Sequence, residues 1–228
     1  MSEVFDLEPE FLELYELCRE QTMTSIERMY ALHTATRYIV ENDIAGDFVE
    51  CGVWRGGSVM LVAHTLLHLG VSDRTVWLFD TFAGMTAPSA EDIQEMSGRS
   101  AHEILAEHRK SEDDPFWGVA PRNVVEENLR RTGYPDANIR FIEGDVLDTI
   151  PANAPNDVAL LRLDTDWYAS TRHELEHLYP RVTQRGVVIV DDYGYWRGSR
   201  KATDECLERA GHPLLHRIDF TGRMWVKP

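Results

Sequence analysis

Short apolar runs alternate with stretches of helical periodicity along most of this chain. The apolar runs are rich in β-branched and aliphatic residues and are bounded by turn residues, which is typical of buried strands. We expect strands at residues 48–51, 75–79, 139–142, 158–163 and 187–190. Apolar residues three or four positions apart predict helices at residues 59–69, 123–132, 170–178 and 199–210. Strands that alternate with helices predict an α/β fold with a mostly parallel, doubly wound sheet.

Both ends of the chain extend this pattern. Residues 8–42 carry the spacing of one or two amphipathic helices, so residues 1–45 are predicted to form a helical N-terminal lid. Residues 214–218 and 223–227 flank Thr221-Gly222 and predict a closing hairpin, which would give the sheet an antiparallel end.

Residues 84–120 interrupt the alternation, because they are polar and show no strand character. Two helical pieces are predicted here, at residues 90–96 and 101–109. Such a segment can be a solvated excursion from the fold. Because it directly follows the carboxyl end of a predicted strand, we interpret it as an insertion that covers a substrate.

Composition limits the classes of function. At 228 residues the chain is expected to form a single domain, and its net charge of −16 argues against binding nucleic acid or an anionic membrane. Its three cysteines are widely spaced, so neither a disulfide framework nor a zinc site is expected. No apolar stretch approaches the length of a membrane span, and the N-terminus has no signal-peptide pattern. The expected location is the cytoplasm.

A glycine-rich turn follows the first predicted strand. Gly52, Gly56 and Gly57 would let the backbone approach a ligand closely, and the helix N-terminus that begins near Ser58 favours an anionic group. The spacing differs from the G-x-G-x-x-G of dinucleotide-binding proteins, which weakens an assignment to NAD or FAD. With Glu50 before the first glycine, the turn resembles the opening motif of class I S-adenosylmethionine methyltransferases. A purely structural tight turn would have the same pattern.

Two further carboxylates follow predicted strands. Asp80 ends the second strand, where a carboxylate can accept hydrogen bonds from ribose hydroxyls in several nucleoside-binding α/β folds. Asp145, after Gly144, follows the third strand and could reach an adenine amino group. The alternative is that both residues cap helices or turns.

Four carboxylates gather after the fourth and fifth predicted strands. Asp164 and Asp166 follow one strand, and Asp191 and Asp192 follow the next. Because ligands of open α/β sheets bind beyond the carboxyl ends of the strands, a hard cation such as Mg²⁺ is the expected neutralising partner. Asp164, Asp191 and Asp192 are candidate metal ligands, and Asp166 is a candidate general base beside them. The alternative is again a set of helix and turn caps.

Two other enzyme classes also use a D-x-D motif. Phosphatases of the haloacid dehalogenase type usually carry it near the start of the domain, with Thr or Val where this chain has Tyr168. Metal-dependent glycosyltransferases use it to hold a nucleotide diphosphate, but they lack an upstream glycine-rich acidic motif. A metal-dependent glycosyl- or phosphotransferase remains the alternative to a methyltransferase. A non-catalytic S-adenosylmethionine-binding protein is disfavoured, because close carboxylates are costly to keep without a cation.

Several strings occur together and in a specific order. They are Thr22-Met23, Gly46-Asp47-Phe48-Val49-Glu50, Gly52-Val53-Trp54-Arg55-Gly56-Gly57, Phe79-Asp80-Thr81-Phe82-Ala83-Gly84, Leu161-Arg162-Leu163-Asp164-Thr165-Asp166-Trp167-Tyr168, Ser170-Thr171 and Asp191-Asp192-Tyr193. From about residue 20 to its end, the chain resembles the macrocin O-methyltransferase family. These bacterial, Mg²⁺-dependent enzymes use S-adenosylmethionine to methylate sugar hydroxyls of macrolide and aminocoumarin antibiotics.

The resemblance implies a Rossmann-like class I methyltransferase fold and a set of site residues. With Ser58, Gly144 and Asp145 taken from the strand-end motifs themselves, the candidate cofactor-binding residues are Thr22, Met23, Glu50, Cys51, Gly52, Val53, Trp54, Ser58, Asp80, Thr81, Phe82, Gly84, Gly144 and Asp145. The resemblance also implies Asp164, Asp191 and Asp192 as metal ligands, Asp166 as the general base, and a homo-oligomer. The expected partner is a small-molecule hydroxyl acceptor. Thr165, Trp167 and Asp145 depart from residues usual in the antibiotic enzymes, so the identity of the acceptor does not follow.

Overall fold

The computed structural model describes residues 6–108, 110–111 and 114–228, and it contains a seven-stranded sheet in the order β3-β2-β1-β4-β5-β7-β6. The strands are β1 (Asp47–Cys51), β2 (Val76–Asp80), β3 (Ile139–Glu143), β4 (Val158–Leu163), β5 (Val182–Val190), β6 (His216–Arg217) and β7 (Arg223–Val226). Strands β1 to β5 pair in parallel, whereas β7 is antiparallel to β5 and to β6. The predicted α/β fold with an antiparallel end is confirmed.

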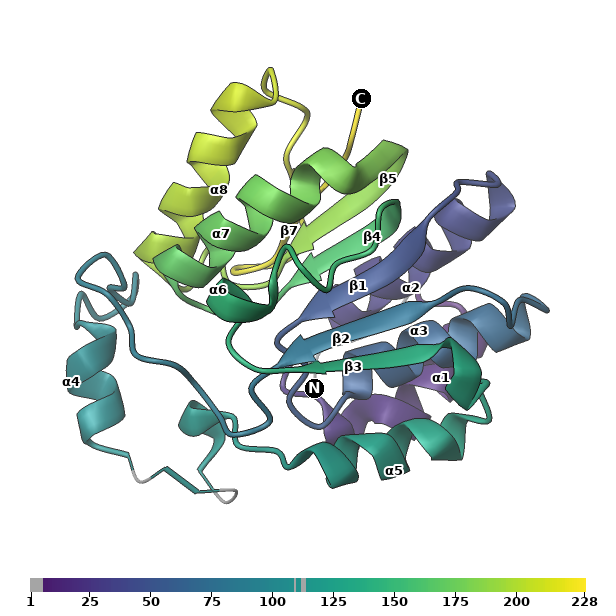
Figure 1. Ribbon diagram of the computed structural model, residues 1–228, viewed down its shortest axis with the longest axis horizontal. Helices are drawn as coiled ribbons and strands as arrows, with labels where there is room; N and C mark the ends of the chain where they lie inside the picture. Colours follow the sequence, from purple (N-terminus) through teal and green to yellow (C-terminus); the bar gives the residue numbers. More distant parts are fainter. Residues whose placement is uncertain (1–5, 109, 112–113) are drawn as a thin grey trace.

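Helices cover both faces of the sheet (Figure 1). One face carries α1 (Pro9–Cys18), α2 (Ile26–Glu41), α3 (Gly57–His68) and α5 (Arg122–Thr132), and the other carries α6 (Val146–Thr149), α7 (Tyr168–Leu178) and α8 (Arg197–Arg209). Alternate residues of β4 enter the two cores: Leu160 packs on the first face and Leu161 on the second. Burial on both faces explains why these strands are continuous apolar runs.

The sequence prediction was least accurate at short and half-exposed elements. β5 begins at Val182 rather than at residue 187. The sequence did not predict its first residues, because Gln184 and Arg185 are exposed and polar. Arg185 nevertheless donates its backbone N–H to the carbonyl of Lys227, so this polar end is part of the sheet. The four-residue helix α6 was not predicted, since so short an element has no periodicity to detect.

The segment at residues 84–120 lies beyond the carboxyl ends of the strands (Figure 1). Its second predicted helix exists as α4 (Ala101–Ala106), and the predicted end at Arg109 lies outside the described residues. The predicted helix at residues 90–96 is wrong. Asp92 is fully buried there, and its carboxylate accepts hydrogen bonds from Ser89 and from the backbone N–H of Tyr168. These side-chain bonds favour a turn over a helix.

The N-terminal segment is helical as predicted. After α1, a 3₁₀ turn at Arg19–Gln21 leads to α2, whose N-cap Ser25 accepts a hydrogen bond from the backbone N–H of Arg28. Residues 1–5 of the predicted lid lie outside the described residues. None of the helices in the described part of the chain is long and apolar enough to cross a membrane.

Candidate active site

A cavity of about 380 Å³ opens at the carboxyl ends of the parallel strands. Residues directly at or after the ends of five strands line it: Gly52, Asp80, Gly144, Asp164 and Asp191. The N-terminal segment contributes Met23, Thr24 and Arg28, and the segment at residues 84–120 contributes Ile104, Leu105 and Phe116, among others. This is the position in which open α/β sheets bind ligands.

Gly52 allows the turn after β1 to approach the turn after β4 closely. Its φ of +79° is a left-handed conformation, and a Cβ at this position would lie 2.0 Å from the carbonyl oxygen of Asp164. Only glycine fits such a close approach of two backbones. The turn after β1 and the turn after β4 are therefore in direct contact.

The Asp80 carboxylate ties two turns together. Its Oδ2 accepts the backbone N–H groups of Val53 (2.7 Å) and Trp54 (3.2 Å), and its Oδ1 accepts that of Phe82 (2.7 Å). Burial raises the pKa of Asp80, and these three N–H donors act against that rise by stabilising the charged form. Asp80 thus supports the glycine-rich turn, and its contact with a ribose stays a prediction.

Glu50 and Ser58 form a buried group with Arg162. The Glu50 carboxylate accepts a hydrogen bond from the Ser58 hydroxyl and pairs with Nη1 of Arg162 at 2.7 Å. Burial raises the pKa of Glu50 to about 7, although the Arg162 charge opposes the rise. None of these three residues lines the cavity. They form a buried polar cluster next to the residues that line the cavity.

The residues implied for cofactor binding divide into two groups. Those that line the cavity are Met23, Gly52, Trp54, Asp80, Thr81, Gly84, Gly144 and Asp145. Those that lie outside its lining are Thr22, Glu50, Cys51, Val53, Ser58 and Phe82. Thr22 accepts the backbone N–H of Thr24, and Asp145 accepts that of Leu147 at the start of α6. The roles of both groups toward a cofactor stay predictions.

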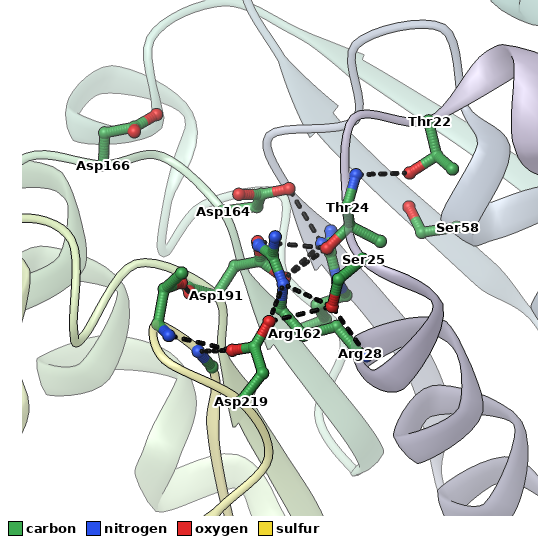
Figure 2. Close-up of polar contacts among 12 residues, drawn as sticks. Thr22, Thr24, Ser25, Arg28, Ser58, Arg162, Asp164, Asp166, Asp191 and Asp219 are labelled. Atoms are coloured by element: carbon green, nitrogen blue, oxygen red, sulfur yellow. Dashed lines mark hydrogen bonds and ion pairs between the residues drawn. The ribbon is translucent and has the colours of Figure 1, made fainter. Parts of the chain in front are cut away.

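The three carboxylates expected to bind a metal are brought together. Oxygen atoms of Asp164, Asp191 and Asp192 lie within 4.8 Å of one another, although Asp164 follows β4 and the other two follow β5. Such spacing suits oxygen ligation of a small divalent cation. Asp166 is not part of this cluster, as Figure 2 shows by its separate position.

Two arginines that the sequence analysis did not identify contact Asp191 (Figure 2). Arg162 Nη2 lies 2.6 Å from Asp191 and 2.9 Å from Asp164, and Arg28 from α2 pairs with Asp191 as well. The Thr24 hydroxyl also donates to Asp191, at 3.1 Å. A lone charge inside the apolar run of β4 was a signal for Arg162, but the amphipathic pattern around Arg28 gave none.

Asp192 is the least compensated carboxylate of the cluster. It is 8% exposed, and within the described residues its Oδ2 has no hydrogen-bond partner. Burial, followed by the charges of Asp166 and Asp164, raises its pKa well above the usual value. A buried carboxylate without a partner is unfavourable, so Asp192 and Asp164 fit a divalent cation well. Asp191 would share its charge between that cation and the arginines.

Asp166 faces the cavity from a strained turn. Its φ is +66°, which is uncommon for a residue other than glycine, and its Oδ1 accepts the indole N–H of Trp196 at 2.7 Å. Burial and then the neighbouring charge of Asp164 raise the pKa of Asp166 to about 8, against the effect of the indole. Strained backbone that the surrounding structure maintains is common at functional sites.

The family comparison agrees with this geometry. A family model described as Macrocin-O-methyltransferase (TylF) matches residues 18–227. A demethyldecarbamoylnovobiocin O-methyltransferase of Streptomyces niveus is 36% identical over 209 residues, which cover 90% of this chain and 75% of that protein. The 8-demethyl-8-(2,3-dimethoxy-alpha-L-rhamnosyl)-tetracenomycin-C 4'-O-methyltransferase of Streptomyces olivaceus is 34% identical, and the match covers 90% of this chain and 74% of that protein.

Solved structures give the same answer for the fold. The O-methyltransferase NovP aligns with a TM-score of 0.78 at 33% identity, covering 91% of this chain and 82% of its own. The calicheamicin methyltransferase CalS11 aligns with a TM-score of 0.67 over 97% and 94%, but at 18% identity it speaks for the fold alone. The relationship favours methyl transfer over the glycosyl- and phosphotransferase alternatives.

Proposed function

Since the chain belongs to the macrocin O-methyltransferase family and is an O-methyltransferase, we propose that it methylates a sugar hydroxyl, or another vicinal-diol hydroxyl, of a small molecule. The proposed methyl donor is S-adenosylmethionine, and the proposed metal is Mg²⁺. One observation carries the proposal: the Asp192 carboxylate, whose Oδ2 has no hydrogen-bond partner among the described residues, lies with Asp164 and Asp191 in the cavity that the glycine-rich turn also lines.

The cavity has two functional sides. On the side of β1 and β2, the turns at Gly52 and Thr81 line the cavity, and we assign them to the cofactor. Bound S-adenosylmethionine would supply an electrophilic methyl group on its sulfonium. Its positive charge suits a cavity whose wall carries many carboxylates.

On the side of β4 and β5, Asp164 and Asp192, with Asp191, would hold Mg²⁺. A bound cation would lower the pKa of an acceptor hydroxyl and fix its orientation. Arg162, which pairs with Glu50, Asp164 and Asp191, would hold the two aspartates in place, and it does not itself line the cavity.

Asp166 is the proposed general base. Bound S-adenosylmethionine would supply its methyl group to the acceptor oxygen, and its sulfur would keep the electron pair of the broken C–S bond, which would give S-adenosylhomocysteine. The hydroxyl proton passes to the Asp166 carboxylate, which faces the same cavity. Positioning two substrates in line can contribute about 7–11 kcal/mol in well-aligned reactions.

The apolar outer wall of the cavity is consistent with an uncharged acceptor. Trp167, Trp196 and Phe116 line it together with Ile104 and Leu105. The two Streptomyces relatives are O-methyltransferases of a rhamnosyl tetracenomycin-C and of demethyldecarbamoylnovobiocin, and a glycosylated small molecule is the acceptor class that we propose.

Calorimetric titration with S-adenosylhomocysteine, with and without Mg²⁺, tests this proposal. We expect a dissociation constant on the order of micromolar, which corresponds to a binding free energy of about −8 kcal/mol. A parallel titration with UDP-glucose and Mn²⁺ should show no heat of binding. Binding of the sugar nucleotide without binding of S-adenosylhomocysteine would overturn the proposal.

A further inference from the structure

We propose that Trp196 is a positioning residue that holds the proposed base, Asp166, in its productive orientation, and that the segment at residues 84–120 locks Trp196 in place. The inference rests on the proposed function, because it assumes that Asp166 accepts the proton. It assigns to the segment a part in the reaction beyond covering the cavity.

The contact between the two side chains is direct. The indole Nε1–H of Trp196 donates to Oδ1 of Asp166 at 2.7 Å, and both residues line the cavity. Asp166 sits on a turn with a φ of +66°. The backbone does not by itself select one side-chain rotamer, so a fixed donor to Oδ1 restricts the orientation of the carboxylate at the cavity wall.

Trp196 is itself rigidly held. It is 4% exposed, and its ring packs edge-on against Trp167, with centroids 5.0 Å apart, and against Tyr195 at 5.2 Å. Its backbone N–H donates to the carbonyl of Asp192 at 3.0 Å. The residue therefore joins the turn that carries a proposed metal ligand to the base.

The segment at residues 84–120 fixes the chain on both sides of Trp196. Gln94 forms an isolated antiparallel bridge with Trp196, and the backbone N–H of Arg197 donates to Ile93 at 2.9 Å. The Glu95 backbone N–H donates to Tyr195 at 2.9 Å, and its carboxylate pairs with Arg197 at 2.7 Å. This pairing stabilises the position of the indole at the cavity wall.

Packing alone does not account for the tryptophan. Neighbouring Trp167 satisfies its indole N–H with a backbone carbonyl, that of Thr86, at 3.1 Å. Trp196 instead directs its N–H to a carboxylate in the cavity. A phenylalanine would fill most of the same apolar space but would leave that carboxylate undirected.

A kinetic comparison of Trp196→Phe with the wild type tests the inference. The assay follows methyl transfer from S-adenosylmethionine to methyl α-L-rhamnopyranoside at fixed pH and saturating Mg²⁺. We expect kcat to fall by about tenfold or more, because small misplacements of a reacting group are costly. KM for both substrates should change by less than about twofold, because phenylalanine keeps an aromatic ring at the cavity wall. Equal losses in kcat and affinity would indicate a structural role and overturn the inference.

Trp77→Phe is the matched control. Its indole also donates to a carboxylate, Asp47, at 2.8 Å, but neither residue lines the cavity. The same chemical change there should leave kcat at the wild-type value.

A double-mutant cycle separates this inference from the proposed function. Asp166→Asn alone should lower kcat by roughly 10²-fold, and adding Trp196→Phe should cause no further loss. A further tenfold loss in the double variant would overturn the positioning role. Wild-type turnover by Asp166→Asn would instead reject Asp166 as the base and, with it, that part of the proposed function.

A measurement that needs no turnover tests the contact itself. The chain has six tryptophans, so an ¹H–¹⁵N spectrum contains only six indole N–H signals. The signal that disappears in Trp196→Phe belongs to Trp196. Asp166→Ala removes the acceptor and should move that signal upfield by more than any other indole signal. An unmoved Trp196 signal would overturn the inference.

Discussion

Carboxylates lie near the carboxyl ends of β1 and β2 and directly after β4 and β5, but their environments differ on the two sides. On the first side, Glu50 binds Ser58 and Arg162, and Asp80 accepts three backbone N–H groups. On the second side, Asp192 keeps an oxygen without a partner among the described residues. The first set holds the floor of the cavity together, and the second set holds charge available for chemistry.

The number of internal donors separates the two roles. A buried carboxylate with several donors is satisfied by the fold, whereas one without them requires a cation, a proton or a substrate. Asp166 lies between these cases, because a single indole N–H meets one of its oxygens. Carboxylates near neighbouring strand ends therefore differ in role according to the donors around them.

Asp164→Asn should cause the largest loss, because it acts on the open side of this comparison. The Asp164 side chain is 30% exposed and faces the cavity with Asp192. Losing metal ligation removes several kcal/mol of transition-state stabilisation, so methyl transfer should fall by about 10³-fold or more. Titration of the rate with MgCl₂, and of the protein by calorimetry, measures both effects.

The exposed Asp136, in a 3₁₀ turn before β3, provides the control for Asp164. Asp136→Asn should keep the wild-type rate and Mg²⁺ dependence. An unchanged Mg²⁺ titration in Asp164→Asn would contradict the assignment of this carboxylate as a ligand.

Glu50→Gln tests the closed side of the comparison and should affect stability more than binding. It weakens a hydrogen-bonded ion pair that is only 4% exposed, so the free energy of unfolding should fall by about 2 kcal/mol. Urea unfolding measures that loss. S-adenosylhomocysteine should bind with nearly wild-type affinity, because Glu50 does not line the cavity.

A matched control is Glu127→Gln, in an exposed pair with Arg131 on α5, which should change stability by less than about 0.5 kcal/mol. If Glu50→Gln loses cofactor affinity while its unfolding curve is unchanged, Glu50 contacts the cofactor directly. That outcome would remove the distinction between the two sides.

The sequence predicted most of the fold because apolar runs and helical spacing record burial directly. It predicted the acidic cluster because carboxyl ends of parallel strands meet at one edge of a sheet. It could not distinguish Glu50 from Asp192, since a donor such as Ser58 or Arg162 becomes a neighbour only in the folded chain. Arg28 was missed for the same reason, because its partner Asp191 is 163 positions away.

The wrong helix at residues 90–96 has a similar cause. A buried Asp92 that bonds to Tyr168, 76 positions away, decides the local conformation there, and local spacing contains no trace of that bond. The contact of Trp196 with Asp166 could not be predicted either, because it also depends on the folded arrangement.

Arg28→Met should have the smallest effect of these substitutions, and it should strengthen Mg²⁺ binding rather than weaken it. Arg28 brings a positive charge from α2 to Asp191, and it also pairs with Asp219 at 3.1 Å. A cation entering the acidic cluster is repelled by that charge. For charges a few ångströms apart, the repulsion amounts to about 4 kcal/mol at an effective dielectric constant of about 20. Calorimetric titration of the cofactor-free variant with MgCl₂ should therefore show binding about tenfold tighter than in the wild type.

Arg37→Met, on the same helix but paired with Glu8 and Glu41, should leave the Mg²⁺ affinity unchanged. Weaker Mg²⁺ binding by Arg28→Met would show the opposite role, in which the arginine holds Asp191 in position as a ligand. In that case Asp191 would resemble Asp80, as a carboxylate whose geometry the fold maintains through its own donors. The open side of the cavity would then depend on Asp164 and Asp192 for most of its attraction to a cation.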